Sequence, residues 1–294
     1  MIIIFVHGRS QEKKDPTGLK KLWVEALNEG FINAKLKLEK QIEFKFPYYG
    51  DVLFDLTEKK IRNSALKLMD KGIEGAVPSE AEAEFTKNIL LEMAAYKNIT
   101  EKEINAENIK TVADKAVQNW RVVLIILRLL NRIKGVASAL IEEFTKDVWL
   151  YLTNKAIRLK VNDIVDKEIP TESECVVVAH SLGSIVAYNV LINRANRSNI
   201  KAFVTLGSPL GIKEIVKKLP SDSSPRKSLE GIPIWFNGRD AQDVVALNPI
   251  LASDFRGPPV VKNYNDIDNR SDNQHGIVEY LMNTEVAKLI FSTI

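Results

Sequence analysis

Short apolar runs rich in β-branched residues recur near both ends of the chain, and they predict the strands of a central sheet. Three of them are continuous rather than alternating, which is typical of parallel strands that are buried on both faces. A further run alternates apolar and polar residues, which predicts a strand nearer the edge of the sheet. In chain order the runs cover residues 2–6, 42–49, 175–178, 202–206, 232–236 and 258–265.

Between residues 51 and 165 the pattern changes to that of helices. Glycine and proline become scarce, charged residues become dense, and apolar residues recur at i, i+3 and i+4. One predicted stripe comprises Leu53, Leu56, Ile61, Leu66 and Met69, and another comprises Phe85, Ile89, Leu90 and Met93. Four or five helices are expected in this segment. Three more helices are expected elsewhere, over residues 18–28, directly after Ser181 and from His275 onwards.

One of the inserted helices, Val122–Leu130, is apolar almost all round. We expect it to be the buried centre of the helical segment, and the alternative is an exposed apolar patch for lipid or a partner protein. The change of pattern divides the chain into a core of residues 1–50 and 168–294 and an inserted helical segment of residues 51–167.

The composition is that of a protein with a packed core, and it narrows the classes of partner. Of 294 residues, 45% are hydrophobic and 27% are charged. The 41 Lys and Arg against 38 Asp and Glu give a net charge of +3, which is too balanced for a nucleic-acid binder or a polybasic membrane binder.

The sequence also predicts a cellular compartment. The N-terminus lacks the basic start and long apolar core of a signal peptide. No apolar run approaches the roughly 18 residues of a membrane span. The single cysteine, Cys175, allows no intrachain disulfide, which favours a reducing compartment. We therefore expect a cytoplasmic protein without a transmembrane segment.

The most informative stretch is Cys175–Ser184, where an apolar strand breaks at a serine flanked by small residues. Helical spacing restarts directly afterwards, so Ser181 lies at the tip of a strand–turn–helix. In this context the pattern G-x-S-x-G presents a nucleophilic serine. Gly183 supplies one of the two small residues that the close approach of strand and helix requires, and Ala179 replaces the other glycine. The alternative is an ordinary Ser/Gly loop.

With this elbow the chain resembles the α/β-hydrolase superfamily, most closely its lipase- and esterase-like members. His7-Gly8 after the first strand, the turn Gly207-Ser208-Pro209 and the segment Asp243–Ala246 match further motifs of these enzymes in the same order. The resemblance covers residues 1–50 and 168–294. It implies an α/β fold with a doubly wound, mostly parallel sheet, trimmed at its N-terminal edge, and a large inserted helical cap.

The resemblance also implies a catalytic triad in the order Ser, acid, His. Ser181 is the expected nucleophile. Asp243 is the preferred acid because it follows a strand in the context Asp-Val-Val-Ala, and Asp240 is the alternate. His275 is the expected base, since the other two histidines lie in the first-strand and elbow segments. A solvated surface role is the alternative for the two carboxylates and for His275.

The same resemblance implies an oxyanion hole at Gly8, Arg9 and Leu182, where Gly8 lets the backbone approach a substrate and the two other residues donate amides. Apolar side chains of the cap, at Leu124, Ile125 and Leu129, are expected to line an acyl-binding cleft. No metal and no cofactor are expected, because one cysteine and three dispersed histidines do not form a zinc set and no glycine-rich phosphate loop is present.

The function implied is that of a serine hydrolase that cleaves carboxylic esters, with lipid esters and acyl thioesters included in the class. The expected partner is a small-molecule or lipid acyl ester, with peripheral membrane contact open and nucleic acid excluded. Two alternatives remain. Acyl transfer to an alcohol or thiol would use the same residues, and a non-catalytic interaction protein would use the fold as a scaffold.

Overall fold

The structure of the protein is a computed structural model that describes residues 1–58, 78–107, 114–133, 136, 138–220, 226–271 and 273–294. The strands are β1 (Ile2–Val6), β2 (Glu43–Lys45), β3 (Cys175–His180), β4 (Ile200–Leu206), β5 (Arg226–Lys227), β6 (Trp235–Asp240), β7 (Phe255–Arg256) and β8 (Lys262–Ile267). The helices of the core are α1 (Pro16–Asn33), α8 (Leu182–Asn193), the 3-10 helix η1 (Pro209–Gly211), α9 (Lys213–Lys218), α10 (Ile277–Met282) and α11 (Thr284–Phe291). The inserted helices are α3 (Glu80–Tyr96), α4 (Glu101–Ala106), α5 (Lys115–Leu130), α6 (Ser138–Thr153) and α7 (Lys155–Glu168).

The central sheet has six strands in the order β2-β1-β3-β4-β6-β8, and every neighbouring pair is parallel. This confirms the predicted α/β class with a largely parallel sheet. The alternating run at 42–49 does lie at an edge, although only Glu43–Lys45 pairs with β1. Because all six strands run in one direction, the loops that follow β1, β3, β6 and β8 meet at the same end of the sheet.

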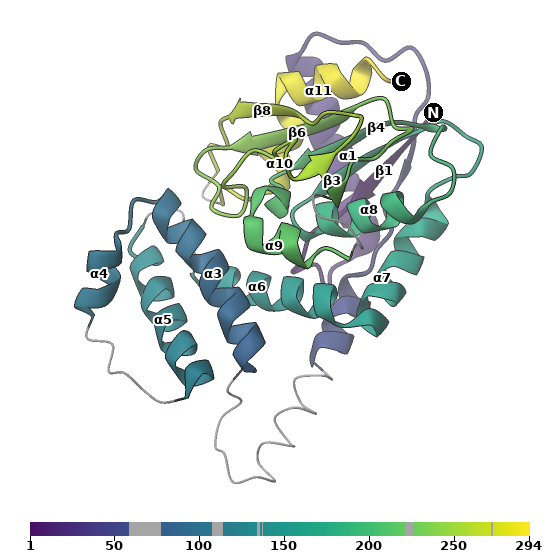
Figure 1. The fold of residues 1–294 in the computed structure, drawn as a ribbon. Helices are drawn as coiled ribbons and strands as arrows, with labels where there is room; N and C mark the ends of the chain where they lie inside the picture. The colour runs from purple at the N-terminus through teal and green to yellow at the C-terminus, as the bar shows by residue number, and fades with distance from the viewer. Residues whose placement is uncertain (59–77, 108–113, 134–135, 137, 221–225, 272) are drawn as a thin grey trace.

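Helices cover both faces of the sheet (Figure 1). Since neighbouring residues of a strand face opposite sides, Ile3 and Phe5 pack with α1, α10 and α11, whereas Ile4 and Val6 pack on the other side with α8 and the inserted helices. β3 is buried along its whole length. This explains why the strands of the core read as continuous apolar runs.

The inserted helices share one continuous apolar core with a face of the sheet. α5 packs closely on α3, and α7 packs on α8. Ile126 and Leu130 are fully buried on α5, as predicted, but Leu124 is 46% exposed. Residues 50–58 are helical, and Ile61, Leu66 and Met69 of the predicted stripe lie outside the described residues.

The C-terminal helix differs from its prediction. His275 does not open a helix: α10 begins two residues later, at Ile277, and a second helix, α11, follows it. The break falls at Asn283, whose side chain accepts hydrogen bonds from the amides of Glu285 and Val286 and so caps α11. His275 therefore lies in a loop, where its position is set by side-chain contacts rather than by helix geometry.

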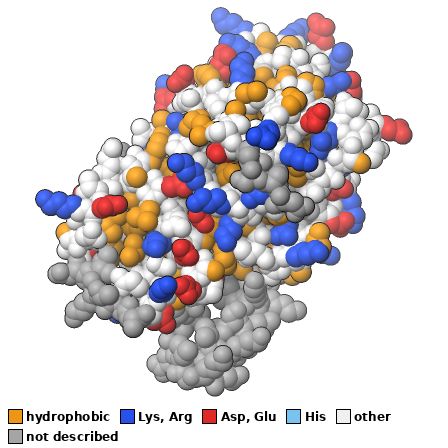
Figure 2. All heavy atoms as spheres, in the orientation of Figure 1, with side chains coloured by type: hydrophobic (Ala, Val, Ile, Leu, Met, Phe, Trp, Pro, Cys, Tyr) orange, Lys and Arg blue, Asp and Glu red, His pale blue; other side chains and the backbone are white. Residues whose placement is uncertain are grey.

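On the face seen in Figure 2, basic and acidic side chains are interspersed, and hydrophobic side chains gather over the region of α3 and α5. The mixture agrees with the small net charge of +3. Within the described part of the chain, none of the helices combines the length and the apolar character needed to cross a membrane.

Candidate active site

Ser181 lies at the sharp turn between β3 and α8. Its φ of 55° and ψ of −132° place a non-glycine residue in a strained region of backbone space. A Cβ on residue 183 would lie 2.3 Å from the carbonyl oxygens of Val6 and His7, so Gly183 is required by the close packing of α8 against the end of β1. The predicted strand–turn–helix is present, and its strain is located at the serine.

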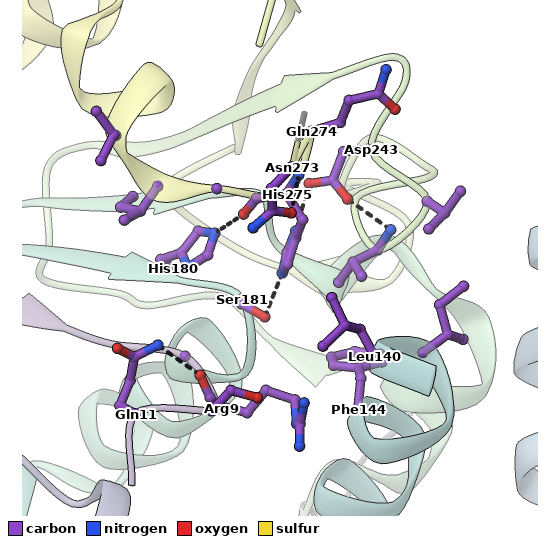
Figure 3. Close-up of a pocket in the computed structure, with 18 of the residues that line it drawn as sticks. Arg9, Gln11, Leu140, Phe144, His180, Ser181, Asp243, Asn273, Gln274 and His275 are labelled. Atoms are coloured by element: carbon purple, nitrogen blue, oxygen red, sulfur yellow. Dashed lines mark hydrogen bonds and ion pairs between the residues drawn. The ribbon is translucent and has the colours of Figure 1, made fainter. Parts of the chain in front are cut away.

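The structure brings the three predicted triad side chains into one hydrogen-bonded chain (Figure 3). His275 Nε2 lies 2.7 Å from Ser181 Oγ, and His275 Nδ1 lies 2.7 Å from Asp243 Oδ2. The Asp243 side chain is fully buried, whereas that of His275 is 26% exposed. With Nδ1–H donating to the carboxylate, Nε2 is left free to accept the serine proton. The arrangement is therefore that of a nucleophile, a general base and an orienting carboxylate.

Asp243 is held in place by more than His275. Its Oδ1 accepts a hydrogen bond from the amide of Val245 at 2.8 Å, and its Oδ2 accepts one from Tyr280 Oη at 2.8 Å. Burial is the main reason why the pKa of Tyr280 is raised well above 10, and the neighbouring Asp243 carboxylate adds to it. Tyr280 thus stays protonated and donates. This role of Tyr280 could not be predicted from the sequence, because a tyrosine on an amphipathic helix gives no signal of its own.

Asp240, the alternate acid, does not contact His275. Its Oδ1 accepts from the amide of Gln242 at 2.6 Å, and its Oδ2 accepts from the amide of Asn269 at 2.8 Å. Asn269 Nδ2 in turn donates to the carbonyls of Gln274 (3.0 Å) and Gly276 (2.9 Å), on either side of His275. Asp240 therefore connects the loop that carries Asp243 to the loop that carries His275. The sequence of the polar loop 266–274 gave no sign of this connection.

The predicted oxyanion residues lie beside Ser181. A Cβ on residue 8 would come within 2.8 Å of Ser181 Cβ and 3.3 Å of its Oγ, so Gly8 leaves the space above the serine open. Leu182 begins α8, and the first amides of a helix have no partner within it. The Leu182 N–H is therefore available at the helix N-terminus, next to the serine.

The peptide between Gly8 and Arg9 is oriented by His7, which is fully buried. His7 Nδ1 donates to the carbonyl of Gly8 at 2.6 Å, and its Nε2 accepts the amide of Tyr49 at 3.1 Å. Tyr49 Oη also donates to the His7 carbonyl. Since C=O and N–H point in opposite directions across a trans peptide, the Arg9 N–H points away from His7. Burial lowers the pKa of His7 to about 4, so it stays neutral.

His180 supports the histidine loop from the elbow. Its Nε2 donates to the His275 carbonyl at 2.9 Å, and the two rings lie 4.7 Å apart. Burial, reinforced by His275, lowers the pKa of His180 well below 6.5. His180 therefore acts as a neutral hydrogen-bond donor.

Ser181 and His275 line a cavity of about 660 Å³ at the carboxyl end of the sheet. Its volume lies within the usual range for small-molecule sites. The inserted segment contributes Val136 and, from α6, Leu140, Ile141 and Phe144.

The predicted cap residues Leu124, Ile125 and Leu129 do not line this cavity. They lie on α5, which packs chiefly on α3, so they are not part of the wall of the cavity that contains Ser181. α6, which follows α5 in the chain, supplies the apolar wall instead.

Within the described residues, no group of three or more His, Cys, Asp and Glu side chains is arranged to hold a metal ion. Comparison of the chain with known protein families, with curated proteins and with solved structures finds no match.

Proposed function

We propose that the protein is a serine hydrolase that cleaves carboxylic esters, and that it is a lipase- or esterase-like member of the α/β-hydrolase superfamily with residues 51–167 as its cap. The observation that carries the proposal is the hydrogen-bonded chain from Ser181 through His275 to Asp243, located on a strained elbow at the floor of a cavity. A non-catalytic scaffold has no need for a strained serine aligned with a buried carboxylate.

In the proposed reaction, Ser181 Oγ attacks the ester carbonyl while His275 Nε2 takes its proton. Asp243 holds the Nδ1–H tautomer and stabilises the imidazolium that forms. His275 then gives the proton to the departing alcohol, which leaves an acyl group on Ser181. Water, deprotonated by the same histidine, releases the acid and restores the serine.

The amides of Leu182 and Arg9 are the proposed donors to the oxyanion. Each donor of this kind contributes about 3–4 kcal/mol to transition-state stabilisation. His7 and Tyr49 support this role, because they fix the peptide that carries the Arg9 amide.

Hydrolysis is favoured over acyl transfer by the exposure of the base. The His275 side chain is 26% exposed, so water has access to the atom that would activate it. Acyl transfer to another acceptor requires that water be kept from the acyl-enzyme.

The test is labelling with a fluorophosphonate, which reacts with an activated serine. We expect the wild-type protein to be labelled and Ser181→Ala to be unlabelled. In a separate assay of ester hydrolysis, Asp243→Asn should lower kcat by about 10³- to 10⁴-fold, because His275 then adopts the wrong tautomer. Ser198→Ala changes an exposed serine and is the matched control. Full labelling of Ser181→Ala, or no labelling of the wild type, would refute the proposal.

A further inference from the structure

Different kinds of side chain surround Ser181 on four sides (Figure 3). His275 lies on one side, with its Nε2 at 2.7 Å from Ser181 Oγ, and Arg9 lies on the opposite side. His180 lies on a third side, and Leu140 and Phe144 lie on the fourth. An acyl carbon bound to the serine therefore lies between His275 and Arg9. Its two remaining substituents then extend towards His180 and towards Leu140.

The His180 side is an apolar wall built from α1 and α10. Trp23 lies against His180, with 6.2 Å between the ring centroids. Trp23 belongs to the core on the α1 face of the sheet, and Ile277 and Val278 pack against that core. The wall comprises Leu19, Leu22, Trp23, Ile277 and Val278, all of which line the cavity.

The opposite side is a second apolar wall, built from the inserted segment and the loop after β6. Val136, Ile141, Phe144, Val244 and Val245 line the cavity and belong to the core on the other face of the sheet. Leu140 stands at the outer end of this wall with 49% exposure, and Leu22 stands at the outer end of the first with 44%. Each wall thus ends in a leucine that reaches solvent.

Charge in the cavity is already compensated or lies at its mouth. The Arg9 guanidinium is bound to Asp147 and Glu143, each at 2.8 Å. Lys14 is exposed, and Asp243 and His275 belong to the triad. Among the described residues that line the cavity, this leaves the two walls without an ionic group to meet a charged substituent.

Building on the serine-hydrolase function proposed above, we propose that the site takes uncharged esters with an apolar group on both the acyl and the alcohol side. One wall holds the acyl chain and the other holds the alcohol chain. Burial of each added methylene against either wall raises kcat/KM by about fourfold.

The experiment uses two substrate series on the full chain. In the first, the acyl group of p-nitrophenyl esters is lengthened from acetate to octanoate. In the second, the alcohol of butanoate esters is lengthened from methyl to octyl and hydrolysis is followed by titration of the released acid. The two series are measured for the wild type, Leu22→Ala, Leu140→Ala and Leu124→Ala. The last of these is the control, since Leu124 is 46% exposed and lies on α5, away from the cavity.

We expect kcat/KM of the wild type to rise along both series. Leu22→Ala should flatten one series and Leu140→Ala the other, each by about tenfold at the longest chain, and Leu124→Ala should flatten neither. The inference is overturned if short chains are preferred in either series, if both variants flatten the same series, or if neither variant has an effect.

Fluorophosphonate labelling separates this failure from failure of the proposed function. If the wild-type protein is labelled at Ser181 but prefers acetate and methyl esters, the proposed serine-hydrolase function stands and the inference of two apolar walls fails. If the wild-type protein is neither labelled nor active on any ester, both the proposed function and the inference fail.

Discussion

Asp240 and Asn269 connect the two loops on which the proposed chemistry depends. Each oxygen of the Asp240 carboxylate holds one loop, through the amides of Gln242 and Asn269. Asn269 then fixes the backbone on both sides of His275. Both side chains are almost completely buried, so these hydrogen bonds form where water does not compete. We infer that the pair positions His275 relative to Asp243 without touching substrate.

Asn269→Asp tests this role, because it keeps the shape of the side chain and removes both donors. A shift of His275 by a fraction of an ångström to 1 Å should lower kcat by about 10- to 100-fold with little change in KM. Alkyl esters should suffer more than p-nitrophenyl esters, since their alcohols need the proton from His275. Asn265→Asp, at an exposed position on β8, is the control. Equal losses for both kinds of ester would contradict a positioning role.

His7 is a neutral, buried histidine whose hydrogen bonds orient the Gly8–Arg9 peptide. Burial is the largest cause of its lowered pKa of about 4; the hydrogen bond to Gly8 opposes the shift, and Lys14 adds to it. In the unfolded chain a histidine titrates near 6.5. Between these values the unfolded state binds more protons than the folded state, so stability falls as the pH falls.

The free energy of unfolding should therefore drop by about 1.4 kcal/mol per pH unit for His7, or about 3 kcal/mol between pH 6.5 and 4. His180 contributes with the same sign, because its pKa is also lowered. His7→Asn keeps a donor for the Gly8 carbonyl and removes the titration. Urea unfolding between pH 4.5 and 6.5 should show a slope that is smaller by one proton in the variant. Equal slopes would mean that the pKa of His7 is the same in the folded protein as in the unfolded chain.

At the scale of elements, the strands of the core were predictable and the roles of the inserted helices were not. β1, β3 and β4 are buried on both faces, so their sequences carry an unbroken apolar signal. The elbow was predictable because strand, small residues and helix follow one another directly. Asn269, Tyr280 and His7 each depend on a partner far away in the chain, namely Asp240, Asp243 and Tyr49, and a local pattern does not encode such partners.

The comparison of α5 with α6 illustrates this limit. Val122–Leu130 on α5 is the more apolar run, and for that reason its side chains were predicted to line the substrate cleft. Apolar character all round predicts burial, and α5 is indeed packed against α3 and α6. α6 borders the site instead. Its Leu140 and Phe144 face the cavity, and its Asp147 and Glu143 bind Arg9 in the loop of the proposed oxyanion hole.

At the scale of the whole molecule, the inserted helices hold the site from two directions. α6 binds the Arg9 loop through Asp147. At the end of α3, Tyr96 Oη donates to the Ala241 carbonyl at 2.8 Å, and Lys97 Nζ donates to the Gln242 carbonyl at 2.9 Å. The loop of the proposed acid and the loop of the proposed oxyanion hole are thus both tied to the insertion. The insertion therefore supports the loops of the proposed site, in addition to supplying a wall of the cavity.

In this arrangement α5 contributes to the stability of the insertion, whereas α6 also contributes to substrate specificity. The same substitution, made once in each helix, tests this difference. Ile126 on α5 is fully buried and does not line the cavity, whereas Ile141 on α6 is 3% exposed and does. Ile126→Val and Ile141→Val each remove one buried methylene and should each lower the free energy of unfolding by about 0.5–1.5 kcal/mol. Only Ile141→Val should lower kcat/KM for the longest ester relative to the shortest, by up to about fourfold, in the series that Leu140→Ala flattens.

Urea unfolding and both ester series are measured on the two variants. If Ile126→Val changes the chain-length profile as much as Ile141→Val does, α5 is coupled to the substrate path and the two helices act as one wall. If neither variant changes it in either series, the substrate chains do not reach this part of the insertion. A change confined to Ile141→Val means that α5 stabilises the insertion while α6 contacts the substrate, because the same lost methylene then affects catalysis only where it borders the cavity.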